Sequence, residues 1–303
     1  MHEIILKTKR GDYMDTCFFG SMYLANKKKI YKSFGNNPSE IYFMRSLAKP
    51  LQTSILFDCN IIGEYKITNP ELAIFSGSHS GSDRHIAFLK DIFKKYKLKE
   101  KDLLIKPIEP LDKRKFKGKA QKLHNNCSGK HTMMLLMCKY LNLKADYTNP
   151  NHPLQEIIKE KQEKLSQYKS DILTYDGCTT PLWGLPCENI IAAYFNLIKK
   201  HPALINAIVN NSYLYGGYNR FDTEIIKLSN KKLFAKVGAG GLVLVYNREK
   251  EEILLVKMAQ DNNEARRTVT LDYLKKLNWL DFELDKNIYN QKKQIVAKYE
   301  FSL

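Results

Sequence analysis

The sequence contains no apolar run that approaches the roughly 18 residues a membrane-spanning helix needs. Its first residues, MHEIILKTKRGDY, lack the apolar block of a secretory signal peptide. Internal repeats, linkers and low-complexity segments are also missing. These absences predict a cytoplasmic protein with no membrane partner. The 303 residues are expected to form a single domain over 1–303, with enough chain to bury a full core.

Cysteine is too scarce and too scattered for a disulfide framework in a chain of this length. Any cysteine chemistry is therefore expected to involve thiolates or a metal, although a single cysteine is most often just a small buried apolar residue. The six cysteines are Cys17, Cys59, Cys127, Cys138, Cys178 and Cys187.

Acidic residues are few beside basic ones: 32 Asp and Glu face 49 Lys and Arg, for a formal charge of +17. Such an excess raises the hypothesis of nucleic-acid binding. However, the excess is mostly lysine scattered among Asn and Ile, whereas base and phosphate recognition favours arginine. The densest run, 94–122, carries interleaved acids and prolines. It predicts a solvated surface segment, and no nucleic-acid partner is expected.

The apolar pattern predicts strands at both ends of the chain and helices between them. This order indicates an α/β (α+β) protein in which N- and C-terminal strands form one antiparallel sheet packed with helices. Strands are expected within 3–35 and at 232–237, 241–247 and 252–258, followed by a Lys- and Asn-rich tail. Helices are expected at 47–59, 82–97, 128–142, 153–167, 189–199, 202–212, 221–229 and 263–277.

The segment MRSLAKPLQ places Ser46 three residues before Lys49 at a predicted helix start. Positions i and i+3 share a helix face, so the hydroxyl and the amine can come within hydrogen-bond reach. A lysine whose pKa is lowered can accept the serine proton and activate the hydroxyl as a nucleophile. Pro50 is tolerated only in the first helical turn. Ser-x-x-Lys also occurs by chance in many helices, so the spacing alone does not establish catalysis.

Two later segments extend this pattern. SGSHSGSDRH (76–85) follows SLAK, and KVGAGG (236–241) places Lys236 before small residues on a predicted strand. Serine hydrolases with Ser-x-x-Lys combine it with a second polar motif and a Lys-Thr-Gly strand in this order. His79 and His85, within the first of these segments, are interpreted as ordinary hydrogen-bonded polar residues.

Two glycine-bearing segments could hold a metal. LHNNCSGKH (123–131) carries Cys127 and Lys130, and YDGCTTP (175–181) carries Asp176 and Cys178. Two thiolates and a third donor could bind Zn²⁺ and leave a fourth position for water or substrate. His124 and His131 also remain candidate ligands. Burial of the cysteines as small apolar residues is the competing interpretation.

Taken in order, six motifs resemble the rhizobial-type L-asparaginases of the asparaginase II family. They are RSLAKPLQ, SGSHSG, LHNNCSGKH, DGCTTP, GYNRFDT and KVGAGG, within a resemblance that spans about residues 3–267. The resemblance implies a serine β-lactamase or penicillin-binding-protein-like (transpeptidase-like) fold and a homodimer. It also implies hydrolysis of the small molecule L-asparagine to L-aspartate and ammonia.

The resemblance further implies a role for nine residues. Its two Ser-Lys tandems fall on Ser46 with Lys49 and Ser78 with Lys236, and its zinc ligands fall on Cys127, Lys130 and Cys178, with Arg45 and Asp176 lining the substrate site. Lysine can bind Zn²⁺ only as the free amine, so the metal itself must lower the pKa of Lys130.

One position departs from the family pattern. The family usually has Gly-Ala-Glu-Gly where this chain has Gly-Ala-Gly-Gly, with Gly240 in place of the acid. Another small amide, such as glutamine or a β-aspartyl compound, therefore remains an alternative substrate. A non-catalytic zinc-dependent or nucleic-acid-binding protein of the same fold is the alternative from a different functional class.

Overall fold

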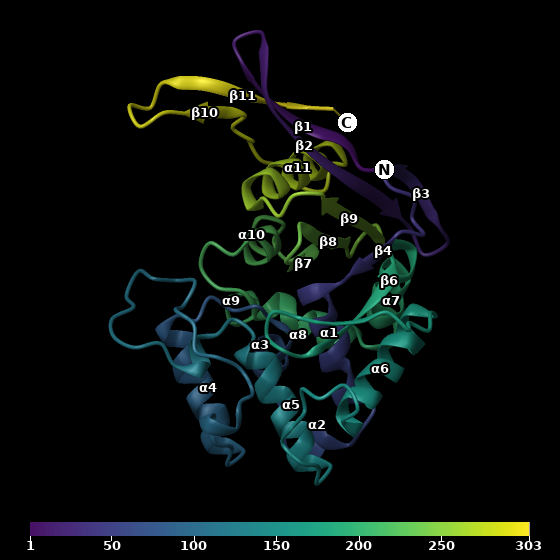
Figure 1. Ribbon diagram of the computed structural model, residues 1–303, viewed down its shortest axis with the longest axis vertical. Helices are drawn as coiled ribbons and strands as arrows, with labels where there is room; N and C mark the ends of the chain where they lie inside the picture. Colours follow the sequence, from purple (N-terminus) through teal and green to yellow (C-terminus); the bar gives the residue numbers. More distant parts are fainter. Residues whose placement is uncertain (303) are drawn as a thin grey trace.

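The computed structural model describes residues 1–302. Its main feature is an eight-stranded antiparallel sheet built from both ends of the chain, in the order β10-β11-β1-β2-β9-β8-β7, with β3 paired to β2 (Figure 1). Its strands are β1 (Glu3–Arg10), β2 (Tyr13–Ala25), β3 (Ile30–Phe34), β7 (Leu233–Gly238), β8 (Leu242–Asn247), β9 (Glu252–Met258), β10 (Asn287–Tyr289) and β11 (Ile295–Phe301). The predicted α/β class and the sheet of terminal strands are confirmed.

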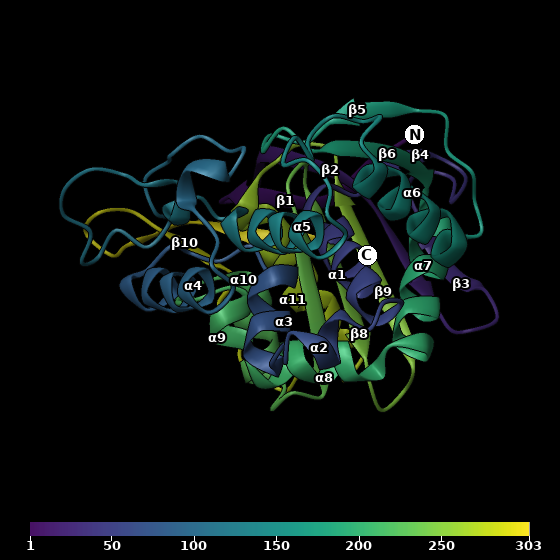
Figure 2. The same ribbon diagram turned by 90° about the horizontal axis from the view of Figure 1, so that it is seen from below.

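The middle of the chain is mainly helical and covers one face of this sheet (Figures 1 and 2). Its longer helices are α3 (Asn69–Ser76), α4 (Asp83–Lys95), α5 (Ser128–Tyr140), α6 (Pro153–Ser166), α7 (Cys187–Lys200), α8 (Pro202–Asn210) and α10 (Phe221–Leu228). Its short helical turns are η1 (Arg45–Leu47), α1 (Ala48–Thr53), η2 (Ser54–Phe57), α2 (Ile61–Glu64), η3 (Glu100–Asp102), η4 (Lys122–His124) and α9 (Ser212–Tyr215). A small sheet joins β4 (Ile41–Phe43), β6 (Pro181–Pro186) and β5 (Leu173–Tyr175).

Both faces of the central strands are buried, so β7 and β8 are apolar throughout rather than alternating. On β7, Phe234 joins the core cluster that contains the middle helices, while Leu233, Ala235 and Val237 join the cluster on the opposite face. Helix α11 (Asn263–Lys276) covers that opposite face. Because side chains alternate along a strand, Lys236 points to the same side as Phe234, toward the helical layer.

Most predicted elements are confirmed within a few residues. The region expected to form one helix over 47–59 is instead the succession η1, α1 and η2, and Pro50 lies in the first turn of α1, as expected. The regions that were missed are α3, the small sheet, the hairpin β10–β11 in the Lys- and Asn-rich tail, and the short helical turns α2, η3 and η4. In β11, Lys298 and Glu300 alternate with Ala297, Tyr299 and Phe301, and this short alternation was overlooked in a segment rich in Lys and Asn.

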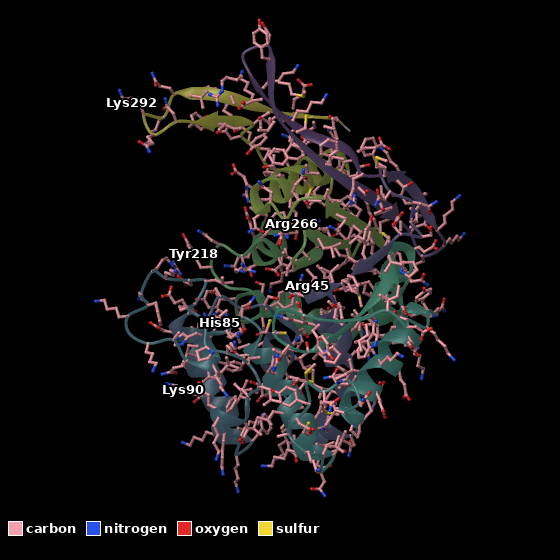
Figure 3. All side chains as sticks on the ribbon, in the orientation of Figure 1. Arg45, His85, Lys90, Tyr218, Arg266 and Lys292 are labelled. Atoms are coloured by element: carbon pink, nitrogen blue, oxygen red, sulfur yellow. The ribbon has the colours of Figure 1, made fainter. Side chains whose placement is uncertain are left out.

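The basic residues are spread over the outside of the molecule. Lys90 and Lys292 project from opposite ends, whereas Arg45 and Arg266 lie toward its middle (Figure 3). The run 94–122 is largely exposed, as predicted. No helix of the described chain has the length and apolar character needed to cross a bilayer.

Candidate active site

The centre of the candidate site is a serine hydroxyl held between two lysine amines. The Nζ of Lys49 donates a hydrogen bond to Ser78 Oγ at 2.8 Å, and the Nζ of Lys236 donates to the same oxygen at 3.2 Å. All three side chains are buried. Two amines that share one hydroxyl can pass protons through it, which is a geometry suited to acid–base catalysis.

Three separate elements supply these groups. Lys49 comes from α1, Lys236 from β7, and Ser78 from the segment that follows α3. Gly77 allows this segment to lie against the C-terminal end of α9, because a Cβ at Gly77 would come within 2.2 Å of the Tyr215 carbonyl oxygen. The cluster is therefore assembled by the packing of the helical layer against the sheet.

Lys236 has a carboxylate partner that the sequence reasoning did not select. Asp222 Oδ2 lies 3.3 Å from Lys236 Nζ, and both side chains are completely buried. Asp222 belongs to GYNRFDT, so the motif was noticed while the role of its acid was not. A buried ion pair of this kind is costly to break, which fixes the position of the amine.

The pKa of Lys236 is lowered to about 8. Burial is the main cause, because it disfavours the charged amine, and the cations Lys49 and Arg220 lower the pKa further. The carboxylate of Asp222 acts in the opposite direction and raises it. Lys236 can therefore change its protonation state near neutral pH.

Ser46 lies beside this cluster in η1 and is partly exposed. Its side chain forms no hydrogen bond with residues 1–302. The preceding residue, Arg45, has a φ of 50°, an uncommon left-handed conformation that turns the chain sharply before Ser46. The i, i+3 spacing predicted a bond between Ser46 and Lys49, but the Lys49 amine instead bonds to Ser78 and, at 3.5 Å, to the Asn126 carbonyl. The long lysine side chain reaches beyond its own turn to the neighbouring segments.

A second cluster contains the predicted metal ligands. Cys127 and Lys130 lie at the start of α5, and Cys178 lies in the loop between β5 and β6. Lys130 Nζ donates to Cys178 Sγ at 2.9 Å and to Thr180 Oγ1 at 2.7 Å. The structure therefore brings together all three residues that the resemblance implied, along with Thr180, which was not predicted.

The thiols of this cluster differ in acidity. The hydrogen bond between them lowers the pKa of Cys178 well below its usual range and raises the pKa of Cys127. Burial alone would lower the pKa of Lys130, but the charges of Cys178, Cys127 and Asp176 outweigh it, so the pKa is raised. An ammonium beside a thiolate is thus favoured without metal, and Zn²⁺ would have to displace the lysine proton.

The donor set fits Zn²⁺. Two buried sulfurs and one amine match the soft, nitrogen- and sulfur-rich coordination that selects zinc. Among residues 1–302 no group of three or more His, Cys, Asp or Glu side chains is arranged as a metal site. The thiol cluster does not meet this criterion through Cys127 and Cys178 alone. The acidic residue beside them, Asp176, is paired with Arg45.

Of the two histidines considered as ligands, His131 is the one that interacts with the thiol cluster. Its Nδ1 is 3.1 Å from the Tyr147 hydroxyl, while its Nε2 is buried without a hydrogen-bond partner in the described structure. The His131 side chain also lowers the pKa of Cys178. His124 uses Nδ1 to accept from the Gln121 amide at 2.9 Å, which keeps that nitrogen from a metal.

His79 and His85 are hydrogen-bonded on both ring nitrogens, as expected of ordinary polar residues. His79 contacts Ser128 Oγ at 2.8 Å and the Gly81 amide at 3.2 Å. His85 contacts Ser82 Oγ at 2.7 Å and the Tyr213 carbonyl at 2.8 Å.

Arg45 and Asp176 connect the two clusters. Arg45 Nε donates to Asp176 Oδ1 at 2.7 Å, and Asp176 Oδ2 lies 3.9 Å from Lys130 Nζ. Because Arg45 directly precedes Ser46, this ion pair places the thiol cluster beside the serine–lysine cluster. The nine predicted residues thus occupy one continuous region.

A comparison with protein families decides the classification: the L-asparaginase II profile matches residues 6–300. The chain belongs to the L-asparaginase II family. This membership supports an asparaginase-type amidohydrolase and confirms the resemblance carried by the six motifs. No curated protein matches the sequence.

Several solved structures are similar to this L-asparaginase II family member at low identity. A β-lactamase from Mycobacterium bovis has 9% identity and a TM-score of 0.44, covering 85% of this chain and 94% of its own. A peptidoglycan synthesis regulatory factor from Streptococcus pneumoniae has 12% identity and a TM-score of 0.43, covering 93% and 87%. FmtA from Staphylococcus aureus has 13% identity and a TM-score of 0.42, covering 90% and 89%.

The departure from the family pattern lies in the turn between β7 and β8. Gly240 has a φ of +72°, and a Cβ there would meet nothing within 4 Å. Asp261 accepts hydrogen bonds from the amides of Gly240 and Gly241, each at 3.0 Å. The turn is therefore held by a carboxylate from another part of the chain.

Proposed function

We propose that the protein is an L-asparaginase that hydrolyses L-asparagine to L-aspartate and ammonia by Ser-Lys catalysis. The observation that carries the proposal is the Ser78 hydroxyl between the amines of Lys49 and Lys236. A shared hydroxyl of this kind can move a proton from one side of a reacting amide to the other. Membership of the L-asparaginase II family supports the substrate.

Ser46 is the proposed nucleophile, because it is partly exposed and its hydroxyl is not engaged by another described residue. Lys49 takes the Ser46 proton as the Ser46 oxygen bonds to the side-chain amide carbon. Backbone amides at the start of the helical turn stabilise the oxyanion. An amine that donates to Ser78 still has its lone pair free for this step.

Ser78 then carries a proton to the leaving group. Lys49 returns its proton to Ser78 Oγ while the Ser78 hydroxyl proton passes to the departing nitrogen, and the C–N bond breaks to release ammonia. Charged Lys236, held by Asp222, stabilises negative charge on Ser78 during the transfer. Water next attacks the aspartyl ester and gives a proton to Lys49, which passes it to the Ser46 oxygen as the ester C–O bond breaks, so that L-aspartate and the Ser46 hydroxyl are released.

Cys127, Lys130 and Cys178 would hold Zn²⁺, with Arg45 and Asp176 contributing to the substrate site. When bound, the metal supplies a Lewis acid and cross-links the two loops that border the site. In the steps above, this chain's own serine and lysine residues supply the nucleophile and move the protons.

Ammonia release from purified, zinc-replete protein tests the proposal. Ser46→Ala and Lys49→Met should each lower kcat by several orders of magnitude, because they remove a nucleophile or its base. Lys49→Met keeps most of the buried side-chain volume, so the unfolding transition should stay close to that of the wild type. Wild-type turnover in either variant would rule out this mechanism.

The substrate is tested on the same protein with a small panel of amides. L-Asparagine should give the highest kcat/KM, above L-glutamine and a β-aspartyl amide. The other amides are included because Gly240 replaces the acidic residue usual in the family and leaves open space at that position. A higher kcat/KM for one of them would retain the amidohydrolase and reassign its substrate.

A further inference from the structure

Arg220 is a cation near Lys236 whose side chain has no hydrogen-bond or ion-pair partner among residues 1–302. It lies in the loop before α10 and lines a cavity of about 660 Å³. Val237, the residue after Lys236, lines the same cavity. The cavity therefore adjoins the strand that carries Lys236, although the Val237 side chain lies on the opposite face of β7 from Lys236.

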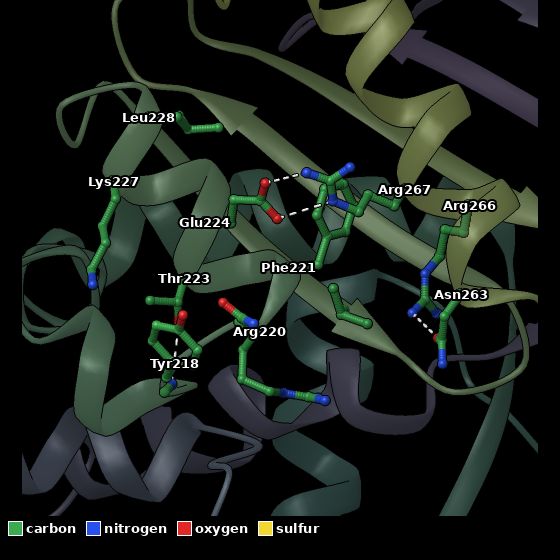
Figure 4. Close-up of a pocket in the computed structure, with 13 residues that line it drawn as sticks. Tyr218, Arg220, Phe221, Thr223, Glu224, Lys227, Leu228, Asn263, Arg266 and Arg267 are labelled. Atoms are coloured by element: carbon green, nitrogen blue, oxygen red, sulfur yellow. Dashed lines mark hydrogen bonds and ion pairs between the residues drawn. The ribbon is translucent and has the colours of Figure 1, made fainter. Parts of the chain in front are cut away.

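The other arginines of this cavity are already engaged. Arg267 forms an ion pair with Glu224, and Arg266 donates to the Gly238 carbonyl at 2.9 Å and to Asn263 Oδ1. Figure 4 shows the Arg220 side chain extending away from the Glu224–Arg267 pair. The Arg220 side chain forms no hydrogen bond or ion pair with residues 1–302, and its Nε is buried without a partner.

The loop that carries Arg220 is fixed against the catalytic segment. Gly217 has a φ of +118°, and a Cβ there would lie 2.2 Å from Ser80 Oγ, two residues after Ser78. Two residues after Arg220, Asp222 contacts Lys236. The charge of Arg220 also contributes to the lowered pKa of Lys236, consistent with a guanidinium close to the amine.

A buried guanidinium nitrogen without a partner is unfavourable, because it has lost water and gained no protein acceptor. A carboxylate is the ligand that best matches the planar fork of donors in arginine. Arg45 is less available for this role because its Nε already donates to Asp176 at 2.7 Å.

We infer that Arg220 binds the carboxylate of the substrate and makes the site selective for small amides that carry a free carboxylate. The inference rests on the proposed amidohydrolase function and adds a substrate-binding residue to it. In an asparagine-like substrate, this group is the α-carboxylate. Its capture would complete the hydrogen bonding of Arg220 while the side-chain amide faces the serine–lysine cluster.

The test compares two substrates in two enzymes. L-Asparagine has the carboxylate, and 3-aminopropanamide has the same amine and amide without it. Arg220→Gln should lower kcat/KM for L-asparagine about 100-fold, mainly through KM, because a charge-assisted bidentate contact is lost. The variant should leave the lower kcat/KM for 3-aminopropanamide nearly unchanged. Arg220→Lys, which keeps the charge but not the fork, should recover only part of the loss.

Arg267→Gln is the matched control, because Arg267 lines the same cavity but is paired with Glu224. It should leave kcat/KM for L-asparagine close to wild type. An equal loss for both substrates in Arg220→Gln would mean that Arg220 acts through the electrostatics or structure of the site. No loss for L-asparagine would also overturn the inference.

Binding of L-aspartate, measured by calorimetry, separates this inference from the proposed function. Wild-type protein should bind L-aspartate, and Arg220→Gln should weaken this binding by a similar factor. Turnover of L-asparagine with unchanged binding in the variant would keep the function and reject the Arg220 contact. Arg220-dependent binding without turnover of any amide would reject the function and keep the contact. If neither turnover nor binding is seen, both are wrong.

Discussion

At the scale of single residues, the site depends on how burial changes the chemistry of lysine. An exposed lysine is charged at neutral pH and cannot act as a base. Lys236 is removed from water, which lowers its pKa to about 8, and Asp222 limits the fall. The protonation state of Lys236 beside Ser78 thus depends on two opposing effects at one amine.

The alkaline side of the pH–rate profile should report Lys236. If the charged amine is the active form, kcat/KM falls as pH rises through about 8, where the proton is lost. The carboxylate of Asp222 raises this pKa, so Asp222→Asn should lower it and move the fall in activity to lower pH. An alkaline limb that stays in place, or moves to higher pH, would show that another group controls it.

The metal prediction also belongs to individual side chains. Elemental analysis should find about one zinc per chain, and Cys127→Ser or Cys178→Ser should remove most of it. Cys17→Ser and Cys59→Ser are matched controls, because these cysteines are free, partly exposed and outside the cluster. Zinc content unaffected by either cluster substitution would contradict the site.

Lys130 and His131 can be distinguished by the same measurement. Lys130→Met should lose zinc if the amine is a ligand, whereas loss of a neighbouring cation would leave affinity unchanged or stronger. If Lys130→Met retains the metal and His131→Ala loses it, the histidine with the unpartnered Nε2 is the ligand instead.

At the scale of elements, close helix contacts position the two clusters. Gly129, in the first turn of α5, lies against α3, and a Cβ there would come within 2.1 Å of the Ile74 carbonyl oxygen. Helix α3 leads to Ser78, and α5 carries Lys130. This contact therefore links the serine–lysine cluster to the thiol cluster through the backbone.

Gly129→Ala should destabilise the protein by about 1–3 kcal/mol, because the added methyl group meets backbone that cannot move alone. Urea unfolding gives the free energy. Gly63→Ala, in the short helix α2, is the control. A Cβ at Gly63 would lie 3.4 Å from the Asn60 side-chain oxygen, an ordinary contact with a flexible side chain. Equal stability in the two variants would show that the α3–α5 contact is not tight.

At the scale of the whole molecule, strands near the chain ends form one edge of the sheet, while the candidate site lies at the opposite edge. Strand β11 pairs with β1, with Leu6 opposite Phe301 and Thr8 opposite Tyr299. Strand β7, which carries Lys236, lies at the opposite edge in the order of the sheet. Substitutions or deletions at the β10–β11 edge can therefore change the stability of the protein without contacting the candidate site.

Removing residues 286–303 should lower the unfolding temperature, because it uncovers the edge of β1 and apolar side chains that pack against Tyr299 and Phe301. The protein that remains folded should keep a kcat/KM close to wild type. Lys292→Ala, in the exposed turn of the same hairpin, should change neither quantity. Loss of catalysis in folded, truncated protein would contradict the separation of the two edges.

The homodimer implied by the family resemblance remains a prediction at this scale. Light scattering at several protein concentrations measures it directly.

The sequence by itself determined the local structure and the family. Period-two and period-3.6 patterns identified most strands and helices, since those patterns depend on neighbouring residues alone. Six ordered motifs identified the L-asparaginase II family. They also identified the serine, lysine and cysteine candidates, because each lies in a short segment with its own spacing.

Only the tertiary structure decided which candidates touch. Lys49 bonds to Ser78 rather than to its sequence neighbour Ser46, and Lys236 is held by Asp222. The Arg220 side chain has no hydrogen-bond or ion-pair partner among residues 1–302, which its position in the GYNRFDT motif did not indicate. These outcomes depend on long-range packing and on which charges become buried together. Such partners are separated by up to 158 residues along the chain, as for Ser78 and Lys236, so no local pattern contains them.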